Sequence, residues 1–482
     1  MILLQYQNFV MLIGSLFVLD WFFFLPLFKV SFSPRDSNGR NGIKNSVFLY
    51  GLATVWLLSL ISFMSALPLA RLIGAGVLTL IFHHYFIALR WKSVRRGFGA
   101  PGFMAHWTIR FFFLVELLRC FQPSGELVRL FLFVIQWDFG WIMICAGVYK
   151  LLVGYLKNNG MEFGKVNPFW GYHASRLGNE VQGTILPRIE NYFACLVEIA
   201  AGTCMIIPVP TLQMVGAVAI MVRFIYVAFF IRLGRLSFLM TCIPFFYFPQ
   251  VGKTILTSEA AFHLSAPEWL LATLKICMLL YVMIVPVIKI MQYSNLFLDK
   301  KFPEPLQHWF TQFANRVPII IWRVFTPDVT DFYVRIWGAD AQGVKQELLV
   351  DEKTYGLANW GRPLFKLRML HVSESIAITS VFTTLKYFPS DRNLFERKLI
   401  RYTDSLAVDL KDVYSRFCFE YVKIVKFNLK FEMVPIADFW VDLISRQVSQ
   451  KNWQAEFDFS KPAQFSPVRE SMSPGNWLPK KN

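Results

Sequence analysis

A series of long apolar runs in the first 298 residues constrains the fold of this chain more than any other feature. Several runs are as long as the 17–25 residues that a helix needs to cross a bilayer. Prolines lie at the joints between them, where a missing amide hydrogen disturbs a helix least. The sequence therefore predicts an all-α polytopic membrane bundle. We place nine helices, at 8–30, 47–66, 69–91, 105–122, 127–156, 189–208, 211–232, 234–251 and 267–291.

The basic residues predict how these helices are oriented. The chain has a formal net charge of +17, but no aromatic-basic motif accompanies it, so we do not expect nucleic acid as a partner. Lys and Arg gather in the segments 31–46, 90–96, 157–188 and 232–235 and after residue 289. Because cytoplasmic loops carry an excess of basic residues, we expect a multi-pass protein of the cell membrane with the lipid bilayer as partner. Its N-terminus then lies outside and its C-terminal domain in the cytoplasm, while its oligomeric state is left open.

After residue 298 the pattern changes to that of a small α+β soluble domain, which we place at 299–450, followed by a polar, flexible tail at 451–482. Its expected elements are strands at 318–326, 331–337 and 427–434 and helices at 393–406 and 410–424. The seven cysteines follow neither a C-x-x-C nor a Cys/His spacing. We therefore expect neither a disulfide framework nor a metal site.

Ionisable residues inside the predicted helices are candidates for function, because a charge in hydrocarbon is costly. They are Asp20, His83, His84, Arg110, Glu116, Asp138, Lys150, Glu198, Arg223 and Lys275. Arg110, Glu116 and Arg119 are expected to form a structural ion pair, since Glu116 and Arg119 are one helical turn apart. Glu198 is expected to pair with Lys150 or Arg223, either to neutralise charge or to relay protons.

Lys150 has the most specific setting among these residues. Gly140, Gly147 and Gly154 recur every seven residues, so they form a stripe along which a neighbouring helix can approach closely. Lys150 lies one turn from Gly147, which directs its amine toward a packed interior. An amine that is kept from water can become neutral and act as a general base. The alternative is that Lys150 extends its ammonium group to the cytoplasmic interface.

Two further segments hold candidate residues. His83 and His84 are adjacent on one helix, so at most one of them points toward a shared site, where it would polarise a ligand or stabilise a developing anion. The loop 157–188 contains Trp170, Tyr172 and His173, which suit headgroup depth at the membrane interface. This loop is either an interfacial connector or a functional segment.

The sequence from Ala146 to Leu151 (AGVYKL), followed by Trp170-Gly171, resembles the horizontally transferred transmembrane (HTTM) superfamily, which includes the vitamin K-dependent gamma-carboxylases. The segments 196–199 (LVEI) and 232–238 (RLGRLSF) resemble later parts of the family pattern. The likeness covers roughly residues 10–290 and points to a bacterial-type branch. In the carboxylases the lysine in the matching context is the base that deprotonates the reduced quinone.

The resemblance implies an enzyme in which Lys150 is the base and a reduced quinone is the cofactor or a membrane-proximal molecule the substrate. We name Lys150, Glu198, His83 and His84 as candidate catalytic residues. Trp170, Tyr172, His173 and Arg223 are the candidate substrate-binding residues. Because the soluble domain shows no site for a Glu-rich peptide, carboxylase activity does not follow from the likeness. The alternative function is a non-enzymatic transporter or scaffold with structural intramembrane charges.

Overall fold

The computed structural model shows a bundle of helices and one sheet. The described residues are 5–24, 46–84, 99–121, 125–171 without 153 and 157–159, 185–297 without 232 and 234, a few positions between 303 and 313, 330–348 without 344, and 372–451 without 388–391, 411–412 and 428–429. The predicted strand at 318–326, the tail beyond residue 451 and the candidate residues Tyr172 and His173 lie outside them.

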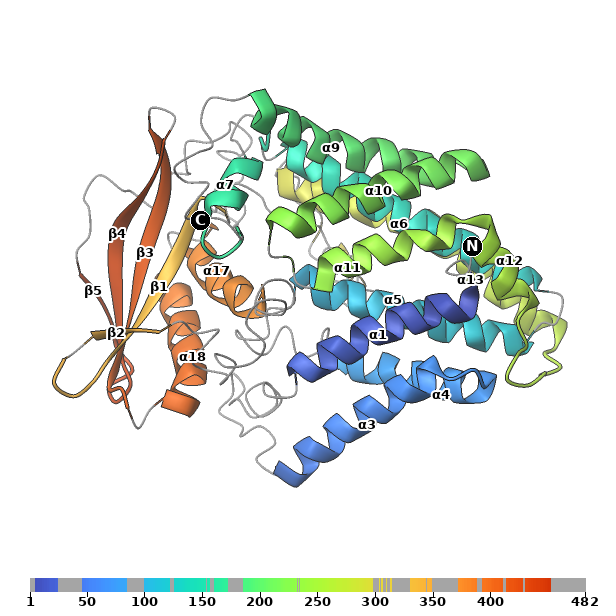
Figure 1. Ribbon diagram of the computed structural model, residues 1–482, viewed down its shortest axis with the longest axis horizontal. Helices are drawn as coiled ribbons and strands as arrows, with labels where there is room; N and C mark the ends of the chain where they lie inside the picture. The colour runs from blue at the N-terminus through green and yellow to red at the C-terminus, as the bar shows by residue number, and fades with distance from the viewer. Residues whose placement is uncertain are drawn as a thin grey trace.

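The N-terminal part of the chain forms a helical bundle, and an antiparallel sheet lies at one end of it (Figure 1). Its long helices are α1 (Tyr6–Phe24), α3 (Ser46–Met64), α4 (Pro68–Phe82), α5 (Gly99–Phe121), α6 (Glu126–Leu152), α9 (Ile185–Ile206), α10 (Pro210–Phe230) and α13 (Glu268–Phe297). They correspond to eight of the nine helices expected. Within the described residues, α6, α9, α10 and α13 are long and apolar enough to cross a membrane.

The helix predicted at 234–251 is wrong as a single element. The chain there forms α11 (Arg235–Cys242), a 3-10 helix η6 (Ile243–Tyr247) and α12 (Pro249–Thr257). Pro249 is the first residue of α12 and Pro244 the second residue of η6. The α-helix is interrupted there because proline has no amide hydrogen to donate and its ring clashes with the preceding turn. The pieces still follow one another along the bundle (Figure 1).

Helices α6 and α9 pack closely because small residues face each other. A Cβ atom on Gly147 would lie 2.7 Å from the carbonyl oxygen of Cys195, and one on Gly202 would lie 2.7 Å from the carbonyl oxygen of Gly140. The predicted glycine stripe is thus confirmed for Gly140 and Gly147. Gly154 has another role, since it follows the end of α6 with a φ of 70°.

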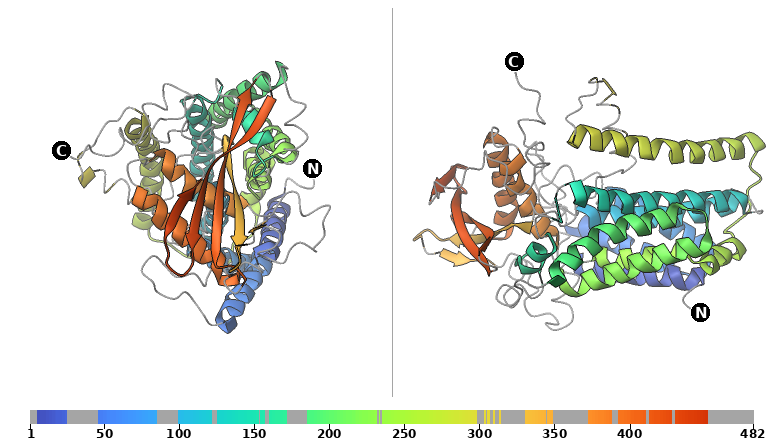
Figure 2. Two further views of the ribbon diagram at one scale, coloured as in Figure 1. Left: turned by 90° about the vertical axis from the view of Figure 1, so that its left-hand side faces the viewer. Right: turned by 90° about the horizontal axis from the view of Figure 1, so that it is seen from above.

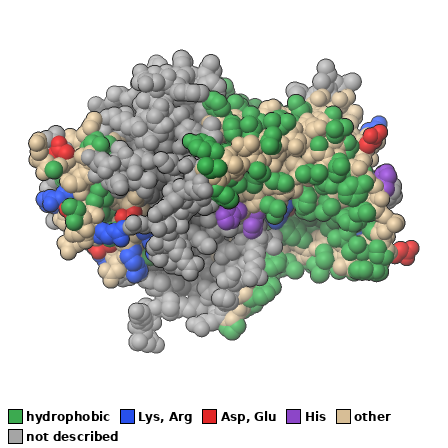
Figure 3. All heavy atoms as spheres, turned by 90° about the horizontal axis from the view of Figure 1, so that it is seen from below, with side chains coloured by type: hydrophobic (Ala, Val, Ile, Leu, Met, Phe, Trp, Pro, Cys, Tyr) green, Lys and Arg blue, Asp and Glu red, His purple; other side chains and the backbone are tan. Residues whose placement is uncertain are grey.

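Helix α13 stands apart from the rest of the bundle (Figure 2). It touches α6 through hydrogen bonds from Tyr281 to Asp138 (3.0 Å) and from Tyr293 to the carbonyl oxygen of Cys145 (2.6 Å). Only 11% of its most apolar stretch is buried, and Figure 3 shows apolar side chains over the broad surface of the bundle. The exposed large side chains of α13 include Trp269, Ile276, Leu279, Leu280, Met283, Val287 and Ile290.

The sheet has the strand order β2-β1-β3-β4-β5 and is antiparallel throughout. Its elements are β1 (Phe332–Ala339), β2 (Lys345–Glu347), β3 (Arg416–Phe427), β4 (Lys430–Asp442) and β5 (Val448–Lys451), with α17 (Val372–Tyr387) and α18 (Arg392–Leu410). Both helices pack against one face of the sheet. The strand expected at 331–337, the helix at 393–406 and the strand at 427–434 are therefore confirmed, with shifted bounds.

The helix predicted at 410–424 is wrong, because most of that stretch is the central strand β3. Phe417, Phe419 and Tyr421 are buried under α17 and α18. Val422 and Ile424 are buried on the other face, against the short helix α7 (Gly160–Val166). With apolar residues on both faces, the alternation that marks a half-buried strand is lost, and the spacing imitates a helix.

Candidate functional site

The amine of Lys150 lies inside the bundle and contacts a carboxylate. Lys150 is in the last turn of α6, and its Nζ is 2.5 Å from each carboxylate oxygen of Glu198, in the middle of α9. The two side chains are 3% and 2% exposed. The close approach of α6 and α9 at Gly147 brings the two groups together. Lys150 therefore does not extend to the interface, and its pairing with Glu198 is as expected.

Arg223 of α10 adds a second cation to this pair. Its guanidinium is 3.8 Å from Glu198, and its side chain is 6% exposed. Its Nε is buried and has no hydrogen-bond partner among the described residues. An unsatisfied buried donor costs free energy, so such a group is a candidate for contact with a ligand or water.

A second ion pair, which is largely buried, lies between the first one and the sheet. Lys165 of α7 places its Nζ 2.5 Å from both carboxylate oxygens of Glu190, near the start of α9, and 3.2 Å from the hydroxyl of Tyr226 in α10. The Tyr226 hydroxyl also donates to Glu190. Tyr226 is one turn from Arg223, and Glu190 is about two turns from Glu198. We call these six residues, Lys150, Glu198, Arg223, Lys165, Glu190 and Tyr226, the polar column.

The polar column carries three cationic side chains and two carboxylates. A buried charge is tolerated when it is paired and hydrogen-bonded, and each carboxylate here contacts at least one cation. The excess cation is Arg223, which is also the one with an unpartnered buried donor. The column therefore fits a ligand that has an anionic or hydrogen-bond-accepting oxygen.

Helix α7 and the turn after it close the sheet end of the column. The backbone amide of Gly171 donates to the carbonyl oxygen of Asn167 (2.7 Å), and a Cβ at position 171 would lie 1.8 Å from the carbonyl oxygen of Lys165. No other residue fits this turn without moving the backbone. Trp170, which precedes Gly171, is 5% exposed and belongs to the core of the bundle. It is thus buried and not at an exposed interface.

Comparison with family models, curated proteins and solved structures gives no match to this chain.

The structure does not bring the histidine pair to Lys150. His83 and His84 are exposed at the end of α4, and the ring of His83 lies 5.3 Å from that of His106 in α5, measured between centroids. Neither histidine is among the described contacts of Lys150. A catalytic role for them stays a prediction, without support from this geometry. Within the described residues, no group of three or more His, Cys, Asp or Glu side chains is placed to hold a metal ion.

The ion pair predicted on α5 is present in altered form. Arg119 is 3.0 Å from Glu116, as expected. Arg110 is not its partner, because it lies beside Tyr281 of α13. Arg71 of α4 takes this place instead, with its Nε 2.6 Å from Glu116. Helix α4 packs against α5, and that tertiary contact has no signature in the spacing along one helix.

Sequence reasoning missed half of the polar column, namely Lys165, Glu190 and Tyr226. The spacing of Glu190 and Glu198 is a usable signal, because residues eight apart lie on the same face of a helix. Arg223 and Tyr226 are related in the same way at a spacing of three. Lys165 gave no signal, since it comes from a loop outside the predicted helices.

Proposed function

We propose that the protein is a multi-pass protein of the cell membrane whose sheet domain lies in the cytoplasm. Four helices of sufficient length and apolarity support this proposal. The facing ends of α1 and α3, which flank the basic segment 31–46, lie at the sheet end of the bundle (Figure 1). The turns after α3 and α9 lie at the other end. We count nine crossings, with α11, η6 and α12 together as one.

Within that membrane domain, Lys150 acts as the base of an HTTM-like enzyme on a lipid-soluble, hydroxyl-bearing substrate. One observation carries this proposal: the amine of Lys150 is enclosed between α6 and α9, bonded to Glu198, with the guanidinium of Arg223 beside them. An enclosed amine with an adjacent proton acceptor is the arrangement that general-base chemistry requires.

The chemistry depends on where the shared proton lies. Away from water the two charged forms are costly, so the proton can move along the short hydrogen bond from the Lys150 ammonium to the Glu198 carboxylate. Neutral Lys150 then accepts a proton from a hydroxyl of the ligand. Arg223 donates its unpartnered Nε–H to an oxygen of that ligand and stabilises negative charge there.

The donors present fit a reduced quinone. Besides the Nε of Arg223, the Nδ2 of Asn191 is buried and without a hydrogen-bond partner in the described part of the chain. Asn191 lies next to Glu190 on α9 and accepts from the amide of Met161 (2.9 Å). A reduced quinone supplies two acidic hydroxyl groups and reducing electrons. Lys150, Arg223 and Asn191 would hold its oxygens.

The test compares the wild type with Lys150→Ala and Lys150→Arg. Protein purified from membranes is extracted for quinones and examined by mass spectrometry. Its oxidation of a reduced naphthoquinone to the quinone, with dissolved dioxygen as the two-electron acceptor, is followed by absorbance in air-saturated proteoliposomes. We expect bound quinone in all three proteins and turnover that falls by about 10²-fold or more in both variants, since neither provides a neutral amine. Turnover at the wild-type rate in Lys150→Ala would refute the role of Lys150 as the base. Wild-type protein that is purified without any bound quinone would refute the proposal that a reduced quinone is the substrate.

A non-enzymatic transporter or scaffold is the second candidate. The observation that favours it is that Lys150 occupies both oxygens of Glu198, as a purely structural ion pair would. The triple variant Lys150→Met, Glu198→Met and Arg223→Met distinguishes the two functions, because it removes Arg223 together with its carboxylate. A structural pair can be replaced by packed apolar side chains of similar volume, so a scaffold or transporter keeps its activity in this variant, whereas the enzyme loses turnover and remains folded.

A further inference from the structure

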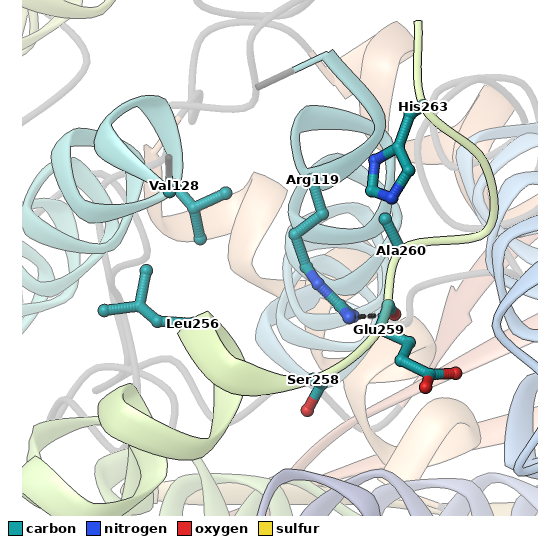
Figure 4. A pocket seen from close by; sticks show the side chains of 8 residues that line it. Arg119, Val128, Leu256, Ser258, Glu259, Ala260 and His263 are labelled. Atoms are coloured by element: carbon teal, nitrogen blue, oxygen red, sulfur yellow. Dashed lines mark hydrogen bonds between the residues drawn. The ribbon is translucent and has the colours of Figure 1, made fainter. Parts of the chain in front are cut away.

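A pocket with a volume of about 370 Å³ lies at the end of the bundle opposite the sheet, where α12 lies (Figure 1). Figure 4 shows the side chains that line it. The pocket is formed by the end of α5, the start of α6, the end of α12 and the loop that follows α12. Val128 in its wall and Lys150 are 22 residues apart on α6, which corresponds to about 33 Å along the helix. The pocket is thus separate from the polar column. Its lining residues are Arg119, Gly125, Val128, Leu256, Ser258, Glu259, Ala260 and His263.

A buried cluster with excess positive charge stands behind one wall. The carboxylate of Glu116, which is fully buried, contacts Arg71 (2.6 Å) and Arg119 (3.0 Å) and accepts a hydrogen bond from the hydroxyl of Tyr6 (2.7 Å). Two guanidinium groups therefore share one carboxylate. The ring of Tyr6 faces both of them, with centroid distances of 5.3 and 5.9 Å. One positive charge is left without a carboxylate in this cluster.

Arg119 brings that charge to the pocket. Its guanidinium has five N–H groups, and its hydrogen bonds within the described part of the chain, to Glu116 and to the carbonyl oxygen of Glu259, are made by two of its nitrogens. Figure 4 shows the carboxylate of Glu259 on the far side of Arg119 from Val128. The imidazole of His263, in the loop that follows α12, points toward the pocket beside Arg119. This wall offers donors and the positive charge of Arg119, and the exposed carboxylate of Glu259 lies at its edge.

The opposite wall is apolar. Val128 and Leu256 face the pocket from α6 and α12, across from Arg119 (Figure 4). Ala260 adds a small side chain beside the guanidinium. A ligand that fits this space has a charged or polar group at one end and hydrocarbon at the other.

The pocket is formed before any ligand binds, because backbone contacts hold its walls. The amide of Leu264 donates to the carbonyl oxygen of Cys120 at the end of α5 (2.8 Å). The bond from Arg119 to the carbonyl oxygen of Glu259 fixes the same loop. Gly125 turns the chain into α6 with a φ of 70°, and a Cβ there would come within 3.1 Å of Leu256. A pre-formed pocket of this size is typical of small-molecule sites.

We propose that this pocket binds an amphiphile with an anionic head group, a carboxylate or a phosphate, held by Arg119, with its hydrocarbon chain along Val128 and Leu256. The excess positive charge of the cluster selects against cationic head groups. The shape and apolar wall select against a free anion without a chain. The site is independent of the Lys150 chemistry.

The test measures binding of radiolabelled decanoate to the full-length protein in nanodiscs of zwitterionic phosphatidylcholine, which has no net charge. Unlabelled decanoate, decyl phosphate, decanol and inorganic phosphate serve as competitors. We expect saturable binding that both decanoate and decyl phosphate displace, at concentrations at least tenfold lower than decanol or inorganic phosphate require. Equal displacement by decanol would show that binding does not require an anionic head group. Equal displacement by inorganic phosphate would show that binding does not require a hydrocarbon chain.

Two variants locate the binding site. Arg119→Gln removes the charge and Ala260→Trp fills the space, and each is expected to raise the Kd for decanoate roughly tenfold or more, because a charge-assisted hydrogen bond or the cavity is lost. Arg416→Gln on the sheet and Ala272→Trp on the exposed face of α13 are the matched controls, with unchanged Kd. If Arg119→Gln does not fold, Ala260→Trp alone decides, since wild-type affinity in that variant places the ligand elsewhere.

Discussion

At the scale of single residues, the pair of Lys150 and Glu198 is the most consequential contact in the bundle. Both side chains are almost fully buried, and removing water from a charge is expensive unless its partner is present. Loss of one partner therefore costs far more than loss of both. This asymmetry makes the pair testable by stability measurements that need no knowledge of the substrate.

The substitution Glu198→Gln leaves the ammonium of Lys150 buried without a counter-charge of its own. We expect a loss of about 3–5 kcal/mol in the free energy of unfolding, measured by denaturant titration in detergent micelles. The double variant Lys150→Met with Glu198→Gln removes the stranded ammonium but leaves the buried Arg223 without its carboxylate, so it is expected to recover part of that loss. A single variant as stable as the wild type would show that the pair does not form.

The sequence predicts some of the buried charged residues and their partners, but not all of them. Lys150 and Glu198 stand out as charges within apolar runs. The glycine stripe further indicates that the side chain of Lys150 points toward a neighbouring helix. The pairing of Glu116 with Arg71 depends on how α4 docks on α5, and Lys165 comes from a loop. Contacts of that kind are fixed by tertiary packing, which no periodicity along one segment encodes.

At the scale of elements, the contact of α6 with α9 positions the site. Gly147 is one of the points where the two helices approach closely, because any Cβ there would meet the Cys195 carbonyl group. Glycine inside a helix is otherwise unfavourable relative to alanine. Its presence at this position is therefore explained by packing and not by helix propensity.

The substitution Gly147→Ala should force α6 and α9 apart and lower the free energy of unfolding by about 1–3 kcal/mol, the usual cost of overpacking. Gly51→Ala in α3 is the matched control, since nothing lies within 4 Å of the added methyl group. That variant should gain about 0.5–1 kcal/mol from helix propensity. Equal effects of the two substitutions on the melting temperature in detergent would contradict close packing at Gly147.

The long helices were the most predictable elements, because runs of apolar residues and flanking prolines fix them locally. Two elements were mispredicted for physical reasons. Pro244 and Pro249 divide an apolar run that is otherwise long enough for one helix. Strand β3 is buried on both faces by helices that are distant in sequence, so its pattern lacks the alternation of a half-exposed strand.

At the scale of the whole molecule, α7 and its turn join the sheet to the bundle. Lys165 reaches into the polar column, while Phe163 and Val166 pack on the sheet against Val422. Asn167 is fully buried and donates to the carbonyl oxygens of Thr330 (2.9 Å) and Phe332 (2.7 Å) at the start of β1. The sheet is therefore hydrogen-bonded to the segment that closes the candidate site.

The substitution Asn167→Asp keeps the acceptor oxygen for the amide of Phe169 but cannot donate to the two carbonyl groups. Each lost hydrogen bond costs about 0.5–1.5 kcal/mol, so we expect faster hydrogen exchange in β1 and α7, with α6 and α9 unchanged. Asn167→Ala should produce the same pattern. Unchanged exchange in both variants would mean that these hydrogen bonds do not couple the sheet to the bundle.

Reactivity of the lysine amines toward a water-soluble acetylating reagent tests most directly whether Lys150 is enclosed. Inside-out membrane vesicles, which expose the cytoplasmic side, are treated, and the acetylation of each lysine is quantified by mass spectrometry, with the exposed Lys345 and Lys451 as internal references. With Lys150 sealed between two helices and held by Glu198, we expect it to stay unmodified until the protein is denatured. Acetylation of Lys150 at the rate of Lys345 in the native protein would contradict the buried pair and the base chemistry that depends on it.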